Sequence, residues 1–449
     1  RPKGHGCFLR CHQGMAGVIS MRLIGTGDAE FKAFFRGIMN RGGGDDEMLR
    51  LAVENIVREV AARGDEALFE YTMKFDGYAL TAASVQVTKE EIEAAAALVH
   101  PDDRSVLELA AARVERFHRR QVLTDWMDDG EEGVRIGQRF TPLERVGIYV
   151  PGGLAAYPST VLMAAVPARI AGVEEIIAVT PLRKGTINPL VALALELGGV
   201  NRVFKIGGAQ AVAALAYGTA AIPRVDKIVG PGNAYVATAK QLVFGRVDID
   251  MIAGPSEVLV ICDHTAPVSF VAADLLAQAE HDDRASAVVL TPDGELARRI
   301  VAEVTSQLAR LPREIIARRS IKSYGAAVVT KDLEEAVELA NIFCPEHLEL
   351  IVEDPERIVP RLRHAGAIFI GPYTPEALGD YLAGPNHILP TGGTARFSSP
   401  LGVYDFVKRT SILSFSGPAF RRYGRQAERF ASLEGLDAHG RSLAVRFPR

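Results

Sequence analysis

Arg145-Val-Gly-Ile-Tyr-Val150 is a short apolar run that ends at Pro151-Gly152-Gly153, and a helix-like segment follows it at residues 158–171. The same order of strand, turn and helix recurs further along, with β-type runs at residues 175–180, 202–206 and 227–229. Short strands that alternate with helices of about 10–15 residues are typical of right-handed βαβ units on a parallel sheet. This stretch therefore predicts an α/β fold.

A second set of alternating strands and helices begins past Gly254-Pro255, where the two sets divide. Its predicted strands are residues 257–262, 285–290, 326–330, 347–352 and 368–370, and the helices between them are residues 267–280, 296–308 and 333–343. Two α/β units are therefore expected. Helix-spaced apolar residues also predict helices within residues 45–118, and the acidic, glycine-containing stretch 126–133 is interpreted as a loop.

The length and composition of the chain exclude several classes of protein. A chain of 449 residues is longer than one hydrophobic core usually organises, so two or more domains are expected. The formal net charge of -4 provides no broad basic field for nucleic acid. Four cysteines make no disulfide framework, and no uncharged apolar run reaches the roughly 18 residues of a membrane-spanning helix. These features predict a cytoplasmic protein that binds neither nucleic acid nor membranes.

Residues 1–20 differ from the rest of the chain. The stretch up to residue 27 carries four basic residues and no acidic one. Cys7, Cys11 and His12 lie close together, but one C-x-x-x-C with a single His is a weak metal pattern without a second half. We expect residues 1–20 to be a disordered or non-native leader.

Four glycine-rich turns follow predicted strands. They are Pro151-Gly152-Gly153, Gly207-Gly208-Ala209-Gln210, Gly230-Pro231-Gly232-Asn233 and Ala253-Gly254-Pro255-Ser256. Ligands of open α/β sheets bind at the carboxyl ends of strands, where such turns let backbone N–H groups approach phosphate. Each turn alone is typical of plain strand-to-helix geometry, and the chain has no G-x-G-x-x-G after a strand. As a set, the turns predict one edge that holds a ligand.

Metal-type ligands occur at separate places in the sequence. Gln278 and His281 are three residues apart at the end of a predicted helix and can point the same way, although this pair alone is a weak signal. Asp380 and His439 add a carboxylate and a second imidazole. Two His, one Asp and one amide oxygen suit zinc or a similar divalent ion. The sequence alone does not show that these side chains converge.

Glu346-His347 opens a predicted strand just after Cys344. A His that titrates near neutrality is a natural base for an alcohol proton, whereas a His at a helix end can instead interact with the helix carboxyl terminus. The residues leave both interpretations open. Thiolates attack aldehydes, so Cys344 offers a covalent route, but we favour an inert Cys344 and a buried Cys262.

Taken together, the motifs resemble histidinol dehydrogenase. The resemblance runs in order from about residue 21 to about residue 446 and depends on no single motif. The stretches that carry it are Arg145-Val-Gly-Ile-Tyr-Val-Pro-Gly-Gly153, Ile206-Gly-Gly-Ala-Gln-Ala211, Gly230-Pro-Gly-Asn-Ala234, Ala253-Gly-Pro-Ser-Glu-Val-Leu259, Ala277-Gln-Ala-Glu-His281, Pro345-Glu-His-Leu-Glu-Leu350 and Pro390-Thr-Gly-Gly-Thr-Ala-Arg-Phe397.

The resemblance implies an NAD-dependent, four-electron oxidation of L-histidinol to L-histidine by way of L-histidinaldehyde, the last steps of histidine biosynthesis. It implies His347 as the general base and Glu346 as the group that activates water. It implies one zinc ion per subunit, which positions the substrate and is held by Gln278, His281, Asp380 and His439. Together with the metal ligands, the implied substrate-binding residues are Ser256, His347 and Glu434. Those implied for NAD are Tyr149, Gln210 and Asn233.

The resemblance also implies a particular fold. We expect two Rossmann-like α/β domains of the aldehyde-dehydrogenase type, with an incomplete dinucleotide fold, and a small C-terminal extension that is swapped in a homodimer. Residues 21–144 and 255–384 would form the first domain, with the metal and catalytic residues. Residues 145–254 would form the second domain, on the NAD side. Residues 385–449 would carry Glu434 and His439 to the partner's active site.

Three other interpretations remain on sequence grounds. A dehydrogenase that acts on sulfonated or other small diols would have different residues where histidinol dehydrogenase binds the imidazole and amino groups of its substrate. The presence of Glu434 favours histidinol. A catalytically silent binding protein would lack Glu346, His347 or a metal ligand, and all are present. Purely architectural glycine turns do not account for so many ordered motifs. The choice among zinc, manganese and cobalt is not written in the sequence.

Overall fold

The computed structural model of the chain describes residues 21–41, 47–152, 157–182 and 185–448. The predicted leader, with Cys7, Cys11 and His12, lies outside these residues. The chain forms two compact units. Unit 1 consists of Arg1–Asp46, Ala253–Asp380 and Leu389–Pro400, and unit 2 consists of Glu47–Ile252, Tyr381–Ile388 and Leu401–Arg449.

Unit 1 contains a six-stranded sheet in which every pair of neighbouring strands is parallel. In spatial order the strands are β1 (Arg22–Gly25), β12 (Gly325–Val329), β11 (Ser286–Thr291), β10 (Glu257–Cys262), β13 (His347–Ile351) and β14 (Ala367–Ile370). The helices are α1 (Phe31–Met39), α10 (Val268–Ala279), α11 (Gly294–Leu308), α12 (Glu314–Tyr324), α13 (Leu333–Phe343), α14 (Pro355–Ile358) and α15 (Glu376–Leu378).

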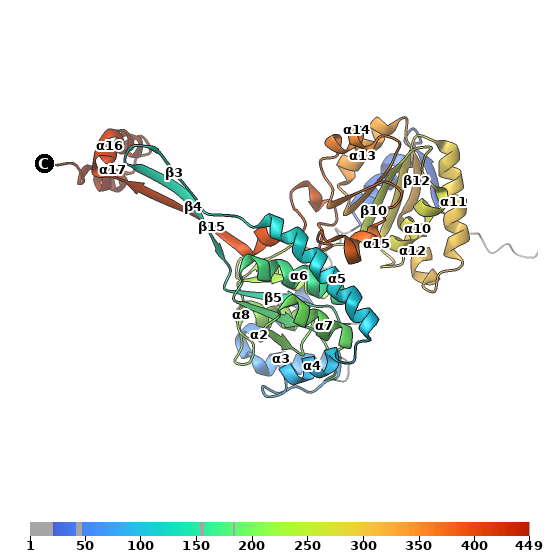
Figure 1. Cartoon of the computed structure of the whole chain (residues 1–449), viewed down its shortest axis with the longest axis horizontal. Coiled ribbons are helices and arrows are strands. Elements are labelled where there is room, and N and C mark those ends of the chain that lie inside the picture. The colour runs from blue at the N-terminus through green and yellow to red at the C-terminus, as the bar shows by residue number, and fades with distance from the viewer. Residues whose placement is uncertain (1–20, 42–46, 153–156, 183–184, 449) are drawn as a thin grey trace, which may run out of the picture. The chain divides into compact units, whose positions relative to one another are not determined.

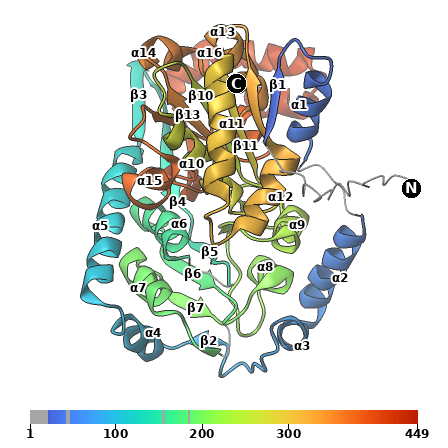
Figure 2. The same ribbon diagram turned by 90° about the vertical axis from the view of Figure 1, so that its right-hand side faces the viewer.

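Helices cover both faces of this sheet because its strands are apolar on both sides (Figures 1 and 2). Val258 and Val260 of β10 pack in one core with α10, α11 and α12. Leu259 and Ile261, which alternate with them, pack in a second core with α1 and α13. Side chains that alternate along a strand point to opposite faces, so one apolar run supplies both cores.

Unit 2 contains a second six-stranded sheet, parallel except for β2 at one edge. In spatial order its strands are β2 (Gln86–Val87), β7 (Arg202–Phe204), β6 (Glu175–Val179), β5 (Arg145–Tyr149), β8 (Lys227–Val229) and β9 (Asp248–Ile249). Its helices are α2 (Glu47–Arg63), α3 (Asp65–Asp76), α4 (Lys89–Ala96), α5 (Pro101–His118), α6 (Pro158–Ala171), α7 (Pro189–Gly198), α8 (Gly208–Tyr217) and α9 (Ala234–Val243). The predicted class of two α/β units is confirmed.

A three-stranded antiparallel sheet completes unit 2. Its order is β15 (Val407–Phe415), β4 (Val134–Pro142) and β3 (Trp126–Glu131), and α16 (Gly417–Leu433) and α17 (Asp437–Ala444) follow β15. The prediction of a loop at residues 126–133 is therefore wrong. All six residues of β3 are exposed, and among the described strands it pairs with β4 alone. An exposed, acidic edge strand carries no alternating apolar pattern, so sequence periodicity does not reveal it.

The division into units differs from the predicted boundaries. Residues 21–144 were expected in one domain with residues 255–384, but Glu47 onward belongs to unit 2. The reason is packing, since Val53 and Val60 of α2 lie in the same core as α8 and α9. The C-terminal segment is also divided, with Leu389–Pro400 in unit 1 and Leu401–Arg449 in unit 2. None of the described helices is both long and apolar enough to cross a membrane.

Candidate active site

The candidate site of unit 1 lies where the neighbouring strands β10 and β13 begin. The two strands are parallel, with Val258 opposite His347, so the residues just before them also lie side by side. Glu257 opens β10, Ser256 immediately precedes it, and Glu346 immediately precedes β13. The turn Ala253-Gly254-Pro255-Ser256 thus lies at the amino end of a unit 1 strand. The sequence analysis grouped this turn with those that follow strands; it does follow the short strand β9, which was not predicted, but its residues 255 and 256 lead directly into β10.

His347 is the centre of the polar contacts. The residue is 3% exposed, and its Nδ1 lies 3.0 Å from the backbone oxygen of Glu257 and 3.1 Å from Oε1 of Gln278. Because both neighbours are acceptors, Nδ1 is assigned the proton, and Nε2 of the neutral ring carries the lone pair. Nε2 lies 3.8 Å from Oδ1 of Asp380. This tautomer makes Nε2 the basic atom.

A group of metal-type donors lies beside His347. Donor atoms of His281, Glu376 and Asp380 all lie within 4.8 Å of one another, and Nε2 of Gln278 is 3.2 Å from Nδ1 of His281. The end of α10 positions Gln278 and His281, and a five-residue π-helical turn, Gly379–Ala383, positions Asp380. One imidazole and two carboxylates fit the donor set that zinc accepts. Of the four predicted ligands, His281 and Asp380 belong to this group, and Gln278 contacts His281 through its amide nitrogen while its amide oxygen lies 3.1 Å from Nδ1 of His347.

Glu434 and His439 are placed elsewhere in the chain. Glu434 caps the carboxyl end of α16, and His439 lies in α17, both in unit 2 and both exposed. Their predicted contribution to substrate and metal binding stays a prediction. Glu376 was not predicted as a member of the donor group, although it lies four residues before Asp380 and is 2% exposed.

Glu346 is buried and its carboxyl pKa is strongly raised. The largest cause is burial, and the second is the nearby carboxylate of Glu257; a hydrogen bond with Ser256 opposes them. Burial also raises the pKa of Asp380 to about 6, and His281 opposes that rise. Carboxyl groups with raised pKa values gather at sites of acid–base chemistry. The geometry supports proton transfer by a carboxyl and an imidazole that are adjacent in sequence.

Glu376 and a further buried carboxyl group, Glu349, lie close together near His347, and sequence reasoning missed both. The backbone N–H of Glu376 donates to Oε1 of Glu349 at 2.9 Å. Burial, followed by the charge of Asp274, raises the pKa of Glu349 to about 8. A signal was available, because Glu349 stands between Leu348 and Leu350 in a strand that is buried throughout.

The two cysteines of the described chain have the features of structural residues. Cys344 ends α13 in the left-handed region, at φ 54° and ψ 59°, and is 1% exposed. Its Sγ lies 3.1 Å from the backbone oxygen of Asn341, and burial raises the thiol pKa. Burial raises the pKa of Cys262 to about 12. A nucleophilic cysteine needs a lowered pKa, so the geometry opposes the covalent route.

The residues predicted to contact NAD all belong to unit 2. The hydroxyl of Tyr149 accepts a hydrogen bond of 3.0 Å from the Gly208 N–H, and the Asn233 side chain caps α9. Gln210 is 1% exposed, and its Oε1 accepts no hydrogen bond from any described residue. These turns follow the parallel strands β5, β7 and β8, so they lie on the same side of the sheet, at the carboxyl ends of its strands. A buried acceptor beside glycine-rich turns fits a polar cofactor.

The two parallel sheets and the buried group of His and carboxyl side chains define a two-domain α/β enzyme. A family model described as "Histidinol dehydrogenase" matches residues 39–447. This chain belongs to the histidinol dehydrogenase family, and it is therefore an oxidoreductase of histidine biosynthesis.

Related proteins agree with this assignment. Histidinol dehydrogenase of Syntrophotalea carbinolica is 57% identical over 426 residues, covering 95% of this chain and 99% of that protein. The Geobacter sulfurreducens protein of the same name is 55% identical over 427 residues, covering 95% and 100%. The crystal structure of histidinol dehydrogenase from Elizabethkingia anophelis matches with TM-score 0.89 at 37% identity and covers 95% of this chain and 98% of that one.

A more distant likeness concerns the fold alone. An acetylating aldehyde dehydrogenase from Geobacillus thermoglucosidasius matches with TM-score 0.50 at 15% identity, over 87% of this chain and 98% of that one. The aldehyde-dehydrogenase type of fold that was predicted from the sequence is consistent with this match.

Proposed function

We propose that this chain oxidises L-histidinol to L-histidine in two NAD-dependent steps, by way of L-histidinaldehyde, with one bound zinc ion per subunit. The observation that carries the proposal is the arrangement of His347. Two acceptors fix its Nδ1–H, and Glu346 Oε2 lies 3.9 Å from the same nitrogen. A base with an assigned tautomer, next to a buried carboxyl, is what an alcohol oxidation followed by an aldehyde hydration requires.

His347 takes the alcohol proton in the first oxidation. Its neutral Nε2 is the basic atom, because the backbone oxygen of Glu257 and the amide oxygen of Gln278 hold the proton on Nδ1. Both acceptors belong to buried residues, so the ring is held in one orientation. The carbinol carbon then gives its hydride to NAD, which is the chemistry that this cofactor supplies when bound.

Glu346 acts in the second oxidation. In its ionised form this buried carboxyl group can take a proton from water that adds to the aldehyde, and its strongly raised pKa makes the carboxylate a stronger base. The addition gives a hydrated aldehyde, which has a C–H bond that can again deliver hydride. One acid–base pair therefore serves both steps without a covalent thiol intermediate.

The metal and NAD each have a residue set in this proposal. Gln278, His281 and Asp380 would hold zinc together with His439, and Glu376 is close enough to join or support them. When bound, zinc would orient the imidazole and amino nitrogens of the substrate, with Ser256 and Glu434 as further contacts. Tyr149, Gln210 and Asn233 would contact NAD, and the buried Oε1 of Gln210 supports this assignment.

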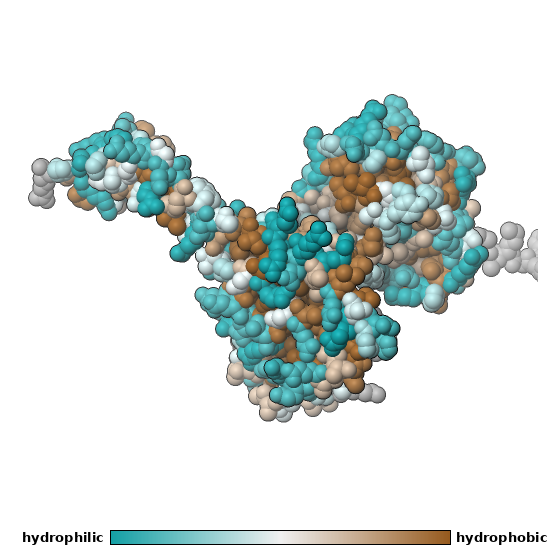
Figure 3. Space-filling view, in the orientation of Figure 1, coloured by the Kyte–Doolittle hydropathy of each residue, from teal (hydrophilic) through white to brown (hydrophobic). Residues whose placement is uncertain are grey.

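We also propose a homodimer in which residues from the C-terminal segment complete the partner's site. Several large apolar side chains of this segment are exposed in the single chain. They include Leu413 at 69%, Phe430 at 64%, Leu433 at 68% and Val445 at 76%. Apolar side chains that gather at a surface favour a protein partner. Figure 3 shows hydrophobic residues among hydrophilic ones on this C-terminal part.

One assay tests the proposed reaction. Purified protein is incubated with L-histidinol and excess NAD, with and without a chelator, and NADH and L-histidine are quantified. We expect two NADH per L-histidinol, loss of activity on metal removal and recovery with zinc. NADH formation after every metal has been stripped would show that the metal assignment is wrong. No turnover of L-histidinol, with turnover of a different small diol, would show that the substrate assignment is wrong.

A further inference from the structure

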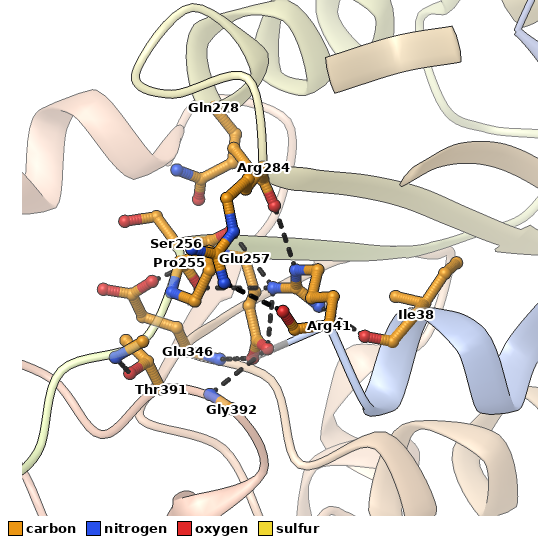
Figure 4. Close-up of polar contacts among 12 residues, drawn as sticks. Ile38, Arg41, Pro255, Ser256, Glu257, Gln278, Arg284, Glu346, Thr391 and Gly392 are labelled. Atoms are coloured by element: carbon orange, nitrogen blue, oxygen red, sulfur yellow. Dashed lines mark hydrogen bonds and ion pairs between the residues drawn. The ribbon is translucent and has the colours of Figure 1, made fainter. Parts of the chain in front are cut away.

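Arg41 and Glu257 form a buried ion pair next to the candidate catalytic residues (Figure 4). The Arg41 Nη2 atom lies 2.8 Å from Oε1 of Glu257, and the two side chains are only 2% and 3% exposed. Sequence reasoning gave neither residue a role. A buried ion pair is a weak source of stability, because desolvation of both charges offsets their attraction. The pair therefore calls for an explanation other than stability.

Arg41 is anchored by backbone oxygens from three segments. Its guanidinium donates to Ile38 at the end of α1, to Arg284 and to the turn before β10 through Pro255 and Ser256. These four bonds measure between 3.0 and 3.2 Å. The fifth partner is the carboxylate of Glu257. An arginine with so many fixed acceptors has one available position, so it holds the Glu257 carboxylate in place.

Glu257 in turn is bonded reciprocally to Glu346. The Glu346 backbone N–H donates to Oε2 of Glu257 at 3.2 Å, and the Glu257 backbone N–H donates to Oε2 of Glu346 at 3.0 Å. The other carboxylate oxygen of Glu257, Oε1, accepts a hydrogen bond from Arg41 and another, of 3.2 Å, from the Gly392 N–H. The backbone oxygen of Glu257 also lies 3.0 Å from Nδ1 of His347. The backbone of Glu257 thus contacts both candidate catalytic side chains, and its carboxylate contacts the backbone of Glu346.

The geometry points to a positioning role for this pair: Arg41 fixes the Glu257 carboxylate, which accepts from the Glu346 backbone N–H, while the Glu257 backbone N–H donates to the Glu346 carboxyl group. Residues 257 and 346 are thereby held together at two points, which fixes the Glu346 carboxyl group in the place where it activates water. Neither Arg41 nor Glu257 would touch the substrate. This inference rests on the proposed function, because it concerns the aldehyde step. It says that two residues that do not react, Arg41 and Glu257, hold the residue that does. A small displacement of an acid–base group lowers the reaction rate by a large factor. A buried ion pair that prevents this displacement can therefore be favourable for catalysis even though burial of its charges costs free energy.

Glu257→Gln is the most direct test, since it keeps the shape of the side chain. Both carboxylate oxygens accept hydrogen bonds, so the amide nitrogen of Gln must face an N–H donor whichever way it is turned. We expect kcat with L-histidinaldehyde to fall about 10- to 100-fold, with a smaller loss in the alcohol step and an unchanged KM. Bound zinc should equal that of the wild type, because the metal donors do not include Glu257.

Arg41→Lys and Ser320→Ala are the companion variants. Lysine keeps the charge of Arg41 but cannot reach five acceptors in a fixed plane, so the same selective loss is expected. Ser320 is fully buried in α12 and donates to the backbone oxygen of Ala285 at 2.9 Å, away from Glu346. Ser320→Ala should lower the melting temperature and leave both rates per folded molecule unchanged. If Glu257→Gln and Arg41→Lys behave like Ser320→Ala, the pair is only structural and the inference is overturned.

A crystal structure of the Glu257→Gln protein provides a readout that does not depend on turnover. We expect the Glu346 carboxyl group to leave its position beside residue 257. An unmoved Glu346 in that variant overturns the inference, even if activity falls. Failure of the wild type to oxidise L-histidinol would instead contradict the proposed function, while the position of Glu346 would still decide the role of the pair. Should Glu257→Gln fail to fold, the structure of Arg41→Lys decides in the same way.

Discussion

The pKa of Glu349 depends strongly on the surroundings of its buried side chain. The residue is 1% exposed in the middle of β13, and burial and the neighbouring Asp274 raise its pKa to about 8. A charged carboxylate would be costly there, so the side chain keeps its proton across most of the neutral range. The proton is lost in the unfolded chain at a much lower pH. The difference makes stability depend on pH.

We predict that unfolding becomes easier as pH rises from 6 to 8, and that Glu349→Gln weakens this dependence. The folded pKa lies above the unfolded one, so between these values the folded protein binds more protons and a rise in pH favours unfolding. Each pKa unit between the two states corresponds to about 1.4 kcal/mol. Urea unfolding at pH 6 and pH 8 measures the free energy directly. Glu353→Gln, at an exposed position in the same segment, is the control. Equal slopes for Glu349→Gln and the wild type would refute the prediction.

At the scale of elements, local sequence signals predicted the parallel sheets well. The predicted helices at residues 158–171 and 333–343 and the predicted strands at residues 227–229 and 257–262 match the observed bounds of α6, α13, β8 and β10. Each has a buried apolar run and a clear boundary at Gly, Pro or an N-cap residue. Helices α16 and α17 were not predicted, although α16 carries a local signal, with Ser416 as its N-cap and a proline in its first turn.

The candidate site was harder to predict than the elements. Gln278 and His281 are close in sequence, and the family resemblance supplied Asp380. Arg41 and Glu257 are 216 residues apart, so no local pattern connects them. Only the register of β10 with β13 places Glu257 next to Glu346. Long-range pairing is what sequence periodicity cannot supply.

The turn after β8 allows a prediction about backbone geometry. Gly230 has φ +109°, and a Cβ there would lie 2.3 Å from the backbone oxygen of Tyr149. Gly245 has φ +94° but open space around it. Alanine costs about 1–3 kcal/mol of backbone strain at both positions, and the clash adds roughly 1–3 kcal/mol at Gly230 alone. Thermal unfolding should therefore show a larger loss for Gly230→Ala than for Gly245→Ala. Equal losses would mean that the contact with Tyr149 is easily relieved.

At the scale of the whole molecule, the proposed metal site is incomplete within unit 1. Gln278, His281 and Asp380 come from that unit, whereas His439 comes from an exposed helix of unit 2. A fourth ligand supplied by another subunit would therefore link dimer formation to substrate binding. Exposed apolar side chains near α17 give the same segment a reason to pair.

Subunit complementation tests this sharing of residues. His347→Ala and His439→Ala chains with different affinity tags are co-expressed, and the heterodimer is isolated by two successive tags. If His439 acts in the partner's site, one site of the heterodimer carries both substitutions and the other is intact. We then expect about half of the wild-type activity per dimer, and almost none in either homodimer. If both residues act within one chain, every site of the heterodimer carries one substitution, and activity stays at the homodimer level. Only exchange of the segment between subunits produces an intact site from two defective chains.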